Sequence, residues 1–190
     1  KFMQEAVPSG EGAMLAVLGM SSKELDKILE TNNKKYECYI ANDNSNLQVV
    51  VSGLKKDINL LSDDLSNKKI KNLRLNVSAP FHCKYMKTAS EKMTSFINDL
   101  NINELEKPII SNVTANEISS PKEIKSLLIS QIEKKVRWLE SVEYMINNGV
   151  KNFVEIGPGK VLSVLIKRIN KNVNVRSINS VEDIKLLIND

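Results

Sequence analysis

One short stretch of the sequence contains a residue type that suits acid–base chemistry. Residues 78–83 are SAPFHC and include His82, the only histidine in 190 residues. They follow residues 72–77, whose alternation of polar and apolar side chains predicts a β-strand. A strand leading into a turn would hold one imidazole in place, and imidazole titrates near neutral pH. His82 is therefore either a general base or acid, or a structural histidine that bonds a backbone carbonyl.

A general base needs a nucleophile, and the sequence offers no obvious one. Cys83 is adjacent to His82, but neighbouring side chains on an extended chain point to opposite sides, so His82 is poorly placed to activate it. The sequence has no G-x-S-x-G motif of the kind that presents a serine nucleophile. If His82 is a base, we expect its nucleophile to lie outside this chain. The chain begins at Lys1 without an initiator methionine, and we expect it to be part of a longer protein.

Other patterns point to structure rather than chemistry. Residues 157–160 are GPGK between a predicted strand and a predicted helix, where backbone amides bind anions. The glycine spacing and the Ser/Thr of a Walker A loop are not there, so we expect a tight turn. Residues 42–46 are rich in asparagine and predict a plain turn. With one histidine and two distant cysteines, Cys38 and Cys83, we expect reduced thiols and no metal site.

Composition narrows the class of protein. The chain is 42% hydrophobic and 26% charged, which is typical of a soluble globular protein. Its net charge is +4, but the lysines are scattered and aromatic residues make up only 5%, so we expect no nucleic-acid partner. No apolar run approaches the length of a membrane span and no secretory signal is present. We therefore expect a cytoplasmic protein without a membrane partner.

The first half of the sequence predicts a small antiparallel sheet with two helices. Six elements are expected there: strands at residues 13–18, 38–41, 48–53 and 72–77, a helix that begins at a capping box of Ser21 and Glu24, and a helix through Ile58, Leu61 and Leu65. The order strand-helix-strand-strand-helix-strand is the ferredoxin-like plan. We expect it to form a small subdomain.

The second half alternates strands and helices, which favours a mostly parallel sheet covered on both faces, as in α/β proteins. Strands are expected at residues 108–113, 152–156 and 173–178, and helices at residues 86–100, from 121, 138–148, 160–169 and 181–188. Three short strands are few for such a sheet, so we expect further strands upstream of Lys1.

Several motifs, in a fixed order along the chain, match one family. They are FMQEAVP at residues 2–8, the N-x-N-S turn at 42–45 that leads to QVV, SAPFHC at 78–83, VRW with SVEYM at 136–145, and EIGPGKVL at 155–162. The chain resembles the C-terminal two-thirds of the malonyl-CoA:acyl carrier protein transacylases, the acyltransferases of bacterial-type fatty acid synthesis. One departure is SNL at residues 45–47, where the family commonly has Ser-Pro-Gly.

The resemblance implies an α/β fold with a ferredoxin-like small subdomain and part of an α/β-hydrolase-like parallel-sheet subdomain. Residues 1–12 would enter from the large subdomain, residues 13–77 would form the small subdomain, and residues 78–190 would form the C-terminal part of the large subdomain.

The resemblance also implies a ping-pong transfer of a malonyl group. In the family, a serine in a GHSLG turn takes malonyl from coenzyme A and passes it to the phosphopantetheine thiol of acyl carrier protein. His82 matches the general base, and Gln131 matches the residue whose main-chain carbonyl holds the other ring nitrogen. Met3, Asn44 and Phe81 match positions that line the substrate pocket.

The family's serine, its oxyanion-hole glutamine and its carboxylate-binding arginine would lie upstream of Lys1, so this chain alone is expected to be inactive. The coenzyme A thioester would be a substrate, with no cofactor and no metal, and we expect a monomer. Two alternatives stay open: an acyltransferase domain of a polyketide or fatty acid synthase, and a non-catalytic homologue that binds carrier protein.

Overall fold

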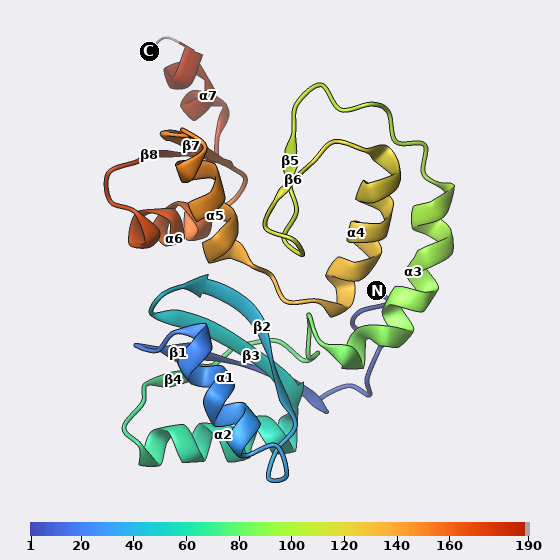
Figure 1. Cartoon of the computed structure of the whole chain (residues 1–190), viewed down its shortest axis with the longest axis vertical. Coiled ribbons are helices and arrows are strands. Elements are labelled where there is room, and N and C mark those ends of the chain that lie inside the picture. Colours follow the sequence, from blue (N-terminus) through green and yellow to red (C-terminus); the bar gives the residue numbers. More distant parts are fainter. Residues whose placement is uncertain (189–190) are drawn as a thin grey trace. The chain divides into compact units, whose positions relative to one another are not determined.

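The computed structural model of the protein describes residues 1–188 and has the mixed α/β class that the sequence predicts (Figure 1). It divides into two compact units, Lys1–Ser141 and Val142–Asp190. The division into residues 1–12, 13–77 and 78–190 stays a prediction. No helix within residues 1–188 combines the length and apolarity needed to cross a membrane.

The first unit contains a four-stranded antiparallel sheet with the predicted order of elements. These are β1 (Gly12–Leu18), α1 (Ser22–Thr31), β2 (Cys38–Ser45), β3 (Gln48–Leu54), α2 (Lys55–Asn67) and β4 (Asn72–Arg74). The strands lie in the order β2-β3-β1-β4, and each pair is antiparallel, which is the ferredoxin-like arrangement. The predicted capping box is confirmed, because Ser21 accepts from the Glu24 amide and Glu24 accepts from the Ser21 amide.

Both faces of this sheet are apolar, and they are covered differently. Alternate residues of a strand point to opposite faces, so Leu15 and Val17 join the larger cluster while Met14 and Ala16 join a smaller one. The larger cluster is completed by apolar residues of α1 and α2, which cover one face (Figure 1). On the other face, Phe81 packs against the smaller cluster. The segment that carries His82 therefore begins against this second face.

β4 is shorter than predicted, and His82 does not follow it directly. The strand ends at Arg74 instead of residue 77. Beyond it, the Leu75 amide still donates to the Met14 carbonyl, but the Val77 amide donates back to Leu75 in a tight turn. Pro80 has no amide proton to extend a ladder. An irregular connection thus carries the chain from the sheet to His82.

The rest of the first unit is mainly helical. It contains the 3₁₀ turn η1 (Lys84–Met86), α3 (Lys87–Asp99), β5 (Ile109–Ile110), β6 (Glu117–Ile118) and α4 (Pro121–Glu133). α3 and α4 lie side by side and share a cluster that includes Met86, Ile97 and Ile132 (Figure 1). The strand expected at residues 108–113 is only two residues long. It pairs antiparallel with β6 instead of entering a parallel sheet, because a tight turn brings its nearest neighbour in sequence alongside it.

The second unit contains a parallel strand pair. α5 (Trp138–Asn147) leads into it, and β7 (Asn152–Ile156), α6 (Val161–Ile169), β8 (Asn174–Ile178) and α7 (Val181–Ile188) follow. β7 and β8 pair in parallel with α6 as the crossover, which confirms the predicted strand–helix alternation in this part of the chain. Several apolar side chains of the unit are exposed, among them Ile156, Val161 and Leu186.

Candidate active site

His82 lies in a turn with an unusual backbone conformation. Its φ is +58°, in the left-handed region that side chains with a Cβ seldom adopt. Such a conformation costs on the order of 1–3 kcal/mol and persists only where the surroundings enforce it. Here the neighbours are tightly packed, because Ala79, Pro80 and Met86 are all fully buried. The packing therefore holds the turn, and with it the imidazole.

The imidazole makes a defined hydrogen bond on one side. Nδ1 lies 2.9 Å from the main-chain oxygen of Gln131. A carbonyl oxygen only accepts, so Nδ1 carries the proton in the neutral ring and Nε2 keeps its lone pair. The bond fixes the tautomer and the orientation of the ring. His82 is thus arranged as a base that accepts a proton at Nε2.

The carbonyl of Gln131 is available because α4 ends shortly after it. The last helical residue is Glu133, and Lys134 is extended with φ −96° and ψ 151°. In a continued helix the amide of Lys135 would donate to the Gln131 carbonyl, since helical bonds join residues four apart. Carbonyls at a helix C-terminus also carry partial negative charge. This carbonyl both orients the ring and favours the imidazolium that forms when Nε2 takes a proton.

The titration of His82 suits a base at neutral pH. Burial lowers the pKa of the imidazole below its ordinary value of 6.5, and the hydrogen bond to Gln131 opposes part of that shift. The neutral form of the ring is therefore favoured at pH 7 more than in a free imidazole. A neutral ring with a free Nε2 is the form that a general base needs.

A hollow of about 390 Å³ opens beside His82. Its lining contains acidic, basic and apolar side chains: Asp26, Tyr39, Ile40, His82, Cys83, Lys84, Glu133, Lys134 and Lys135. His82 therefore lies at the edge of a hollow that opens to the surface.

Cys83 does not serve as the nucleophile. Its thiol is buried and donates to the Pro80 carbonyl at 3.0 Å. Burial raises the pKa of the thiol, so the reactive thiolate is disfavoured at neutral pH. Because His82 is in the left-handed region, the side chains of His82 and Cys83 do not alternate as they would on an extended chain. Burial and the hydrogen bond to Pro80 keep the Cys83 thiol from acting as a nucleophile.

The structure brings four of the five residues singled out from the sequence into one region. Phe81 precedes His82, and Phe81 and Met3 pack against the same cluster between α3 and α4, the helix that carries Gln131. Phe81 also packs on the sheet, so it bridges two clusters and its substitution would disturb both. Asn44 lies half-buried near the end of β2, and its place in the substrate pocket stays a prediction.

A polar network that sequence reasoning missed holds the turn after His82. Glu37 accepts hydrogen bonds from Tyr39, from Tyr85 and from Lys84, at 2.5 Å and 2.8 Å for the two tyrosines. These three donors, with Lys84 first, lower the pKa of the Glu37 carboxyl to about 2. Lys84 also lies over the rings of both tyrosines. The network connects η1 to β2. No local sequence motif predicts it, because the residues in contact are far apart in sequence.

The GPGK turn has the structural role that was expected. Gly157 and Gly159 both have positive φ, which glycine adopts without strain. The carboxylate of Glu155 accepts from the amides of Leu162 and Ser163 at the start of α6. The protein's own side chain therefore occupies the position that an anion would take at this helix N-terminus.

Comparison with known proteins gives a consistent result. Residues 1–186 match the acyl transferase domain family. The malonyl CoA-acyl carrier protein transacylase of Bacillus subtilis (strain 168) is 40% identical over 193 residues, which cover 99% of this chain and 60% of that protein. This chain thus spans about 60% of the length of that curated relative.

Solved structures agree with the sequence matches. The crystal structure of malonyl CoA-acyl carrier protein transacylase from Clostridium perfringens superposes with a TM-score of 0.93 at 37% identity, covering 99% of this chain and 60% of that one. A second similar structure is a type II PKS acyl-carrier protein in complex with its malonyl-transacylase. It gives a TM-score of 0.92 at 32% identity and covers 100% of this chain and 62% of that one.

Proposed function

Because this chain belongs to the acyl transferase domain family, we propose that it carries the acid–base half of a malonyl-CoA:acyl carrier protein transacylase. The observation that supports the proposal most is the bond between His82 Nδ1 and the Gln131 carbonyl, which leaves Nε2 free to take a proton. We assign the serine nucleophile to the part of these relatives that this chain does not span.

In the proposed first half-reaction, Nε2 of His82 takes the proton of the serine hydroxyl as its oxygen attacks the thioester carbonyl of malonyl-CoA. The imidazolium is stabilised by the Gln131 carbonyl, which does the orienting that a carboxylate does in a Ser-His-Asp triad. The tetrahedral intermediate then expels the coenzyme A sulfur, which receives the proton from Nε2. The product is a malonyl ester on serine.

The second half-reaction reverses these roles. Nε2 takes the proton of the phosphopantetheine thiol, whose sulfur attacks the malonyl ester. Serine leaves as its oxygen regains the proton from Nε2, and the malonyl thioester stays on the carrier protein. One imidazole thus serves as base and acid in turn, which requires a ring that is held in place and neutral at rest.

The neighbouring residues have proposed roles in binding. Met3 and Phe81 would contact the acyl group, since they share one cluster beside the His82 turn. The acidic carrier protein would meet Lys84, Lys134 and Lys135 at the border of the hollow beside His82, where Asp26 and Glu133 also lie. We further propose that the protein acts as a monomer with the coenzyme A thioester as a substrate.

The test is malonyl transfer by the full-length protein, measured as the gain of malonyl mass on acyl carrier protein. His82→Ala should lower turnover by about 10²–10⁴-fold, because the base is removed. Asp64→Asn, which breaks the surface pair with Lys35 on the helical side of the sheet, is the control and should keep activity. Near-normal transfer by His82→Ala would overturn the role given to this residue. An unmodified protein that binds carrier protein without transferring malonyl would overturn the enzymatic proposal.

A further inference from the structure

At the end of α4, two donors could bind the Gln131 carbonyl: Nδ1 of His82 and, in a longer helix, the amide of Lys135. Residues 130–136 are SQIEKKV, without the glycine, asparagine or proline that commonly ends a helix, and Glu, Gln and Lys favour helix formation. α5 begins soon afterwards, at Trp138. If α4 ran on, the amide of Lys135 would donate to the Gln131 carbonyl and compete with Nδ1 of His82. Something beyond local sequence must end the helix at Glu133.

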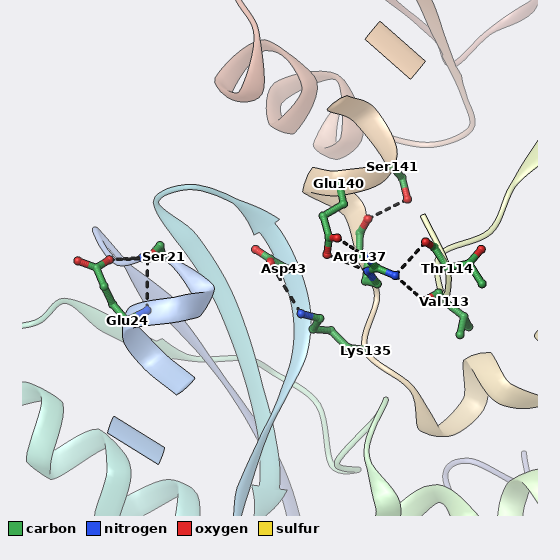
Figure 2. Close-up of polar contacts among 9 residues, drawn as sticks. All are labelled: Ser21, Glu24, Asp43, Val113, Thr114, Lys135, Arg137, Glu140 and Ser141. Atoms are coloured by element: carbon green, nitrogen blue, oxygen red, sulfur yellow. Dashed lines mark hydrogen bonds and ion pairs between the residues drawn. The ribbon is translucent and has the colours of Figure 1, made fainter. Parts of the chain in front are cut away.

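Two attachments hold the segment that leaves α4 in a non-helical path. The first is to β2: the Val136 amide donates to the Ala41 carbonyl at 2.8 Å, and the Asp43 amide donates to the Val136 carbonyl at 2.9 Å. An ion pair between Lys135 and Asp43, 3.9 Å apart, lies beside these bonds (Figure 2). These contacts draw residues 135–136 onto the strand.

The second attachment is the side chain of Arg137, shown in Figure 2. Its Nη1 donates to the main-chain oxygen of Thr114 at 2.8 Å and lies 3.4 Å from that of Val113. Its Nε donates to Glu140 at 2.8 Å, and Nη2 donates to the second oxygen of the same carboxylate. The planar guanidinium can serve the two carbonyls and the carboxylate together, which a lysine ammonium cannot do in this geometry.

The backbone of Arg137 is attached to the same turn as its side chain. The Arg137 amide donates to the Asn112 carbonyl at 3.0 Å, and the Arg137 carbonyl accepts from Ser141 Oγ at 2.8 Å. The turn is well defined, because Ser111 Oγ accepts from the Val113 amide at 3.1 Å. Arg137 therefore attaches the chain between α4 and α5 to the turn of residues 111–114.

We propose that Arg137 is a positioning residue for the acid–base pair: together with the bonds of Val136 to β2, it ends α4 at Glu133 and so keeps the Gln131 carbonyl free for His82. The role in catalysis rests on the proposed function. The positioning itself does not, because it concerns only whether His82 Nδ1 or the Lys135 amide donates to the Gln131 carbonyl. Without the Arg137 side chain, residues 134–136 can become helical. The Lys135 amide then donates to the Gln131 carbonyl, and the His82 imidazole loses its hydrogen-bond partner.

The single histidine makes the test direct. In the ¹⁵N-labelled 190-residue chain, the shifts of the two ring nitrogens show which one carries the proton. Arg137→Ala should move the ring from the Nδ1-protonated form toward a mixture with the Nε2-protonated form, and carbon shifts of residues 134–136 should become helical. Arg137→Lys keeps the positive charge and one donor atom, Nζ, and should give a smaller change. Asp64→Asn should lower stability slightly and leave the ring unchanged.

A second substitution separates positioning from general support of the fold. Proline at residue 135 has no amide proton to compete for the carbonyl and disfavours helical backbone at Lys134, which is already extended. The double variant Arg137→Ala/Lys135→Pro should therefore recover the Nδ1-protonated ring. If Arg137→Ala and Arg137→Lys both leave the ring nitrogens unchanged, or if Lys135→Pro restores nothing, the proposal is wrong. If Arg137→Ala does not fold, Arg137→Lys and Glu140→Gln decide by the same shifts. If the proposed function is wrong, malonyl transfer is absent in the transfer assay, while the shifts of the His82 ring nitrogens are unaffected.

Discussion

Two segments meet at the candidate site, and they are held there in different ways. The segment of residues 79–86 places His82 by close packing around a strained turn, with the Glu37 network at its surface. The end of α4 places the Gln131 carbonyl through hydrogen bonds that stop a helix whose own sequence would let it continue. Packing thus fixes the His82 segment, whereas hydrogen bonds from competing donors fix the end of α4. We therefore expect the His82 segment to be sensitive to changes in side-chain volume, and the end of α4 to be sensitive to the loss of hydrogen-bonding partners.

The largest effect on stability is expected on the histidine side. A Cβ at Gly12 would lie 2.2 Å from Pro80 Cδ and 2.9 Å from Ala79 Cα, so Gly12→Ala must push the backbone that leads to His82. We expect a loss of about 1–3 kcal/mol in the free energy of unfolding, as is typical of overpacking. Thermal or denaturant unfolding measures it.

Gly53→Ala is the matched control for this prediction, because Gly53 is also in the sheet and its added Cβ would approach nothing closer than 3.0 Å. We expect a smaller loss there. Equal unfolding midpoints for Gly12→Ala and the unmodified chain would show that the turn is not fixed by shape.

The smallest effect is expected from the side chain of Gln131. The residue contributes its carbonyl, and its side-chain amide makes only a 3.4 Å contact with the Lys134 carbonyl. Gln131→Ala should therefore keep the tautomer of His82, and transfer by the full-length protein should stay within about threefold of normal, a change worth less than about 1 kcal/mol. A loss as large as that of His82→Ala would mean that the side chain, and not the backbone, supports the base.

The two segments also differ in how far the sequence predicted them. The turn at His82 follows from local signals: a proline, an aromatic residue and a lone imidazole after an alternating run. The ferredoxin-like order and the helices were likewise predictable, because periodicity and capping residues are local. The early end of β4 was not, since Leu75 still bonds the sheet while Val77 turns back on Leu75.

The contacts on the carbonyl side were beyond local reasoning. Gln131 was singled out only by resemblance, and the role of Arg137 was not predicted at all. Both depend on pairings between distant parts of the chain, such as Val136 with β2 and Arg137 with Thr114. The same holds for Glu37, whose partners Lys84 and Tyr85 are more than forty residues away.

The most direct test of the account is the protonation of the His82 ring in the unmodified chain, followed by ¹⁵N shifts as a function of pH. At neutral pH we expect a neutral ring with the proton on Nδ1 and no proton on Nε2. Because burial lowers the pKa, the ring should become charged only as the pH falls below 6.5. A ring with its proton on Nε2, or one that is already charged at pH 7, would contradict the assignment of His82 as a base held by the Gln131 carbonyl.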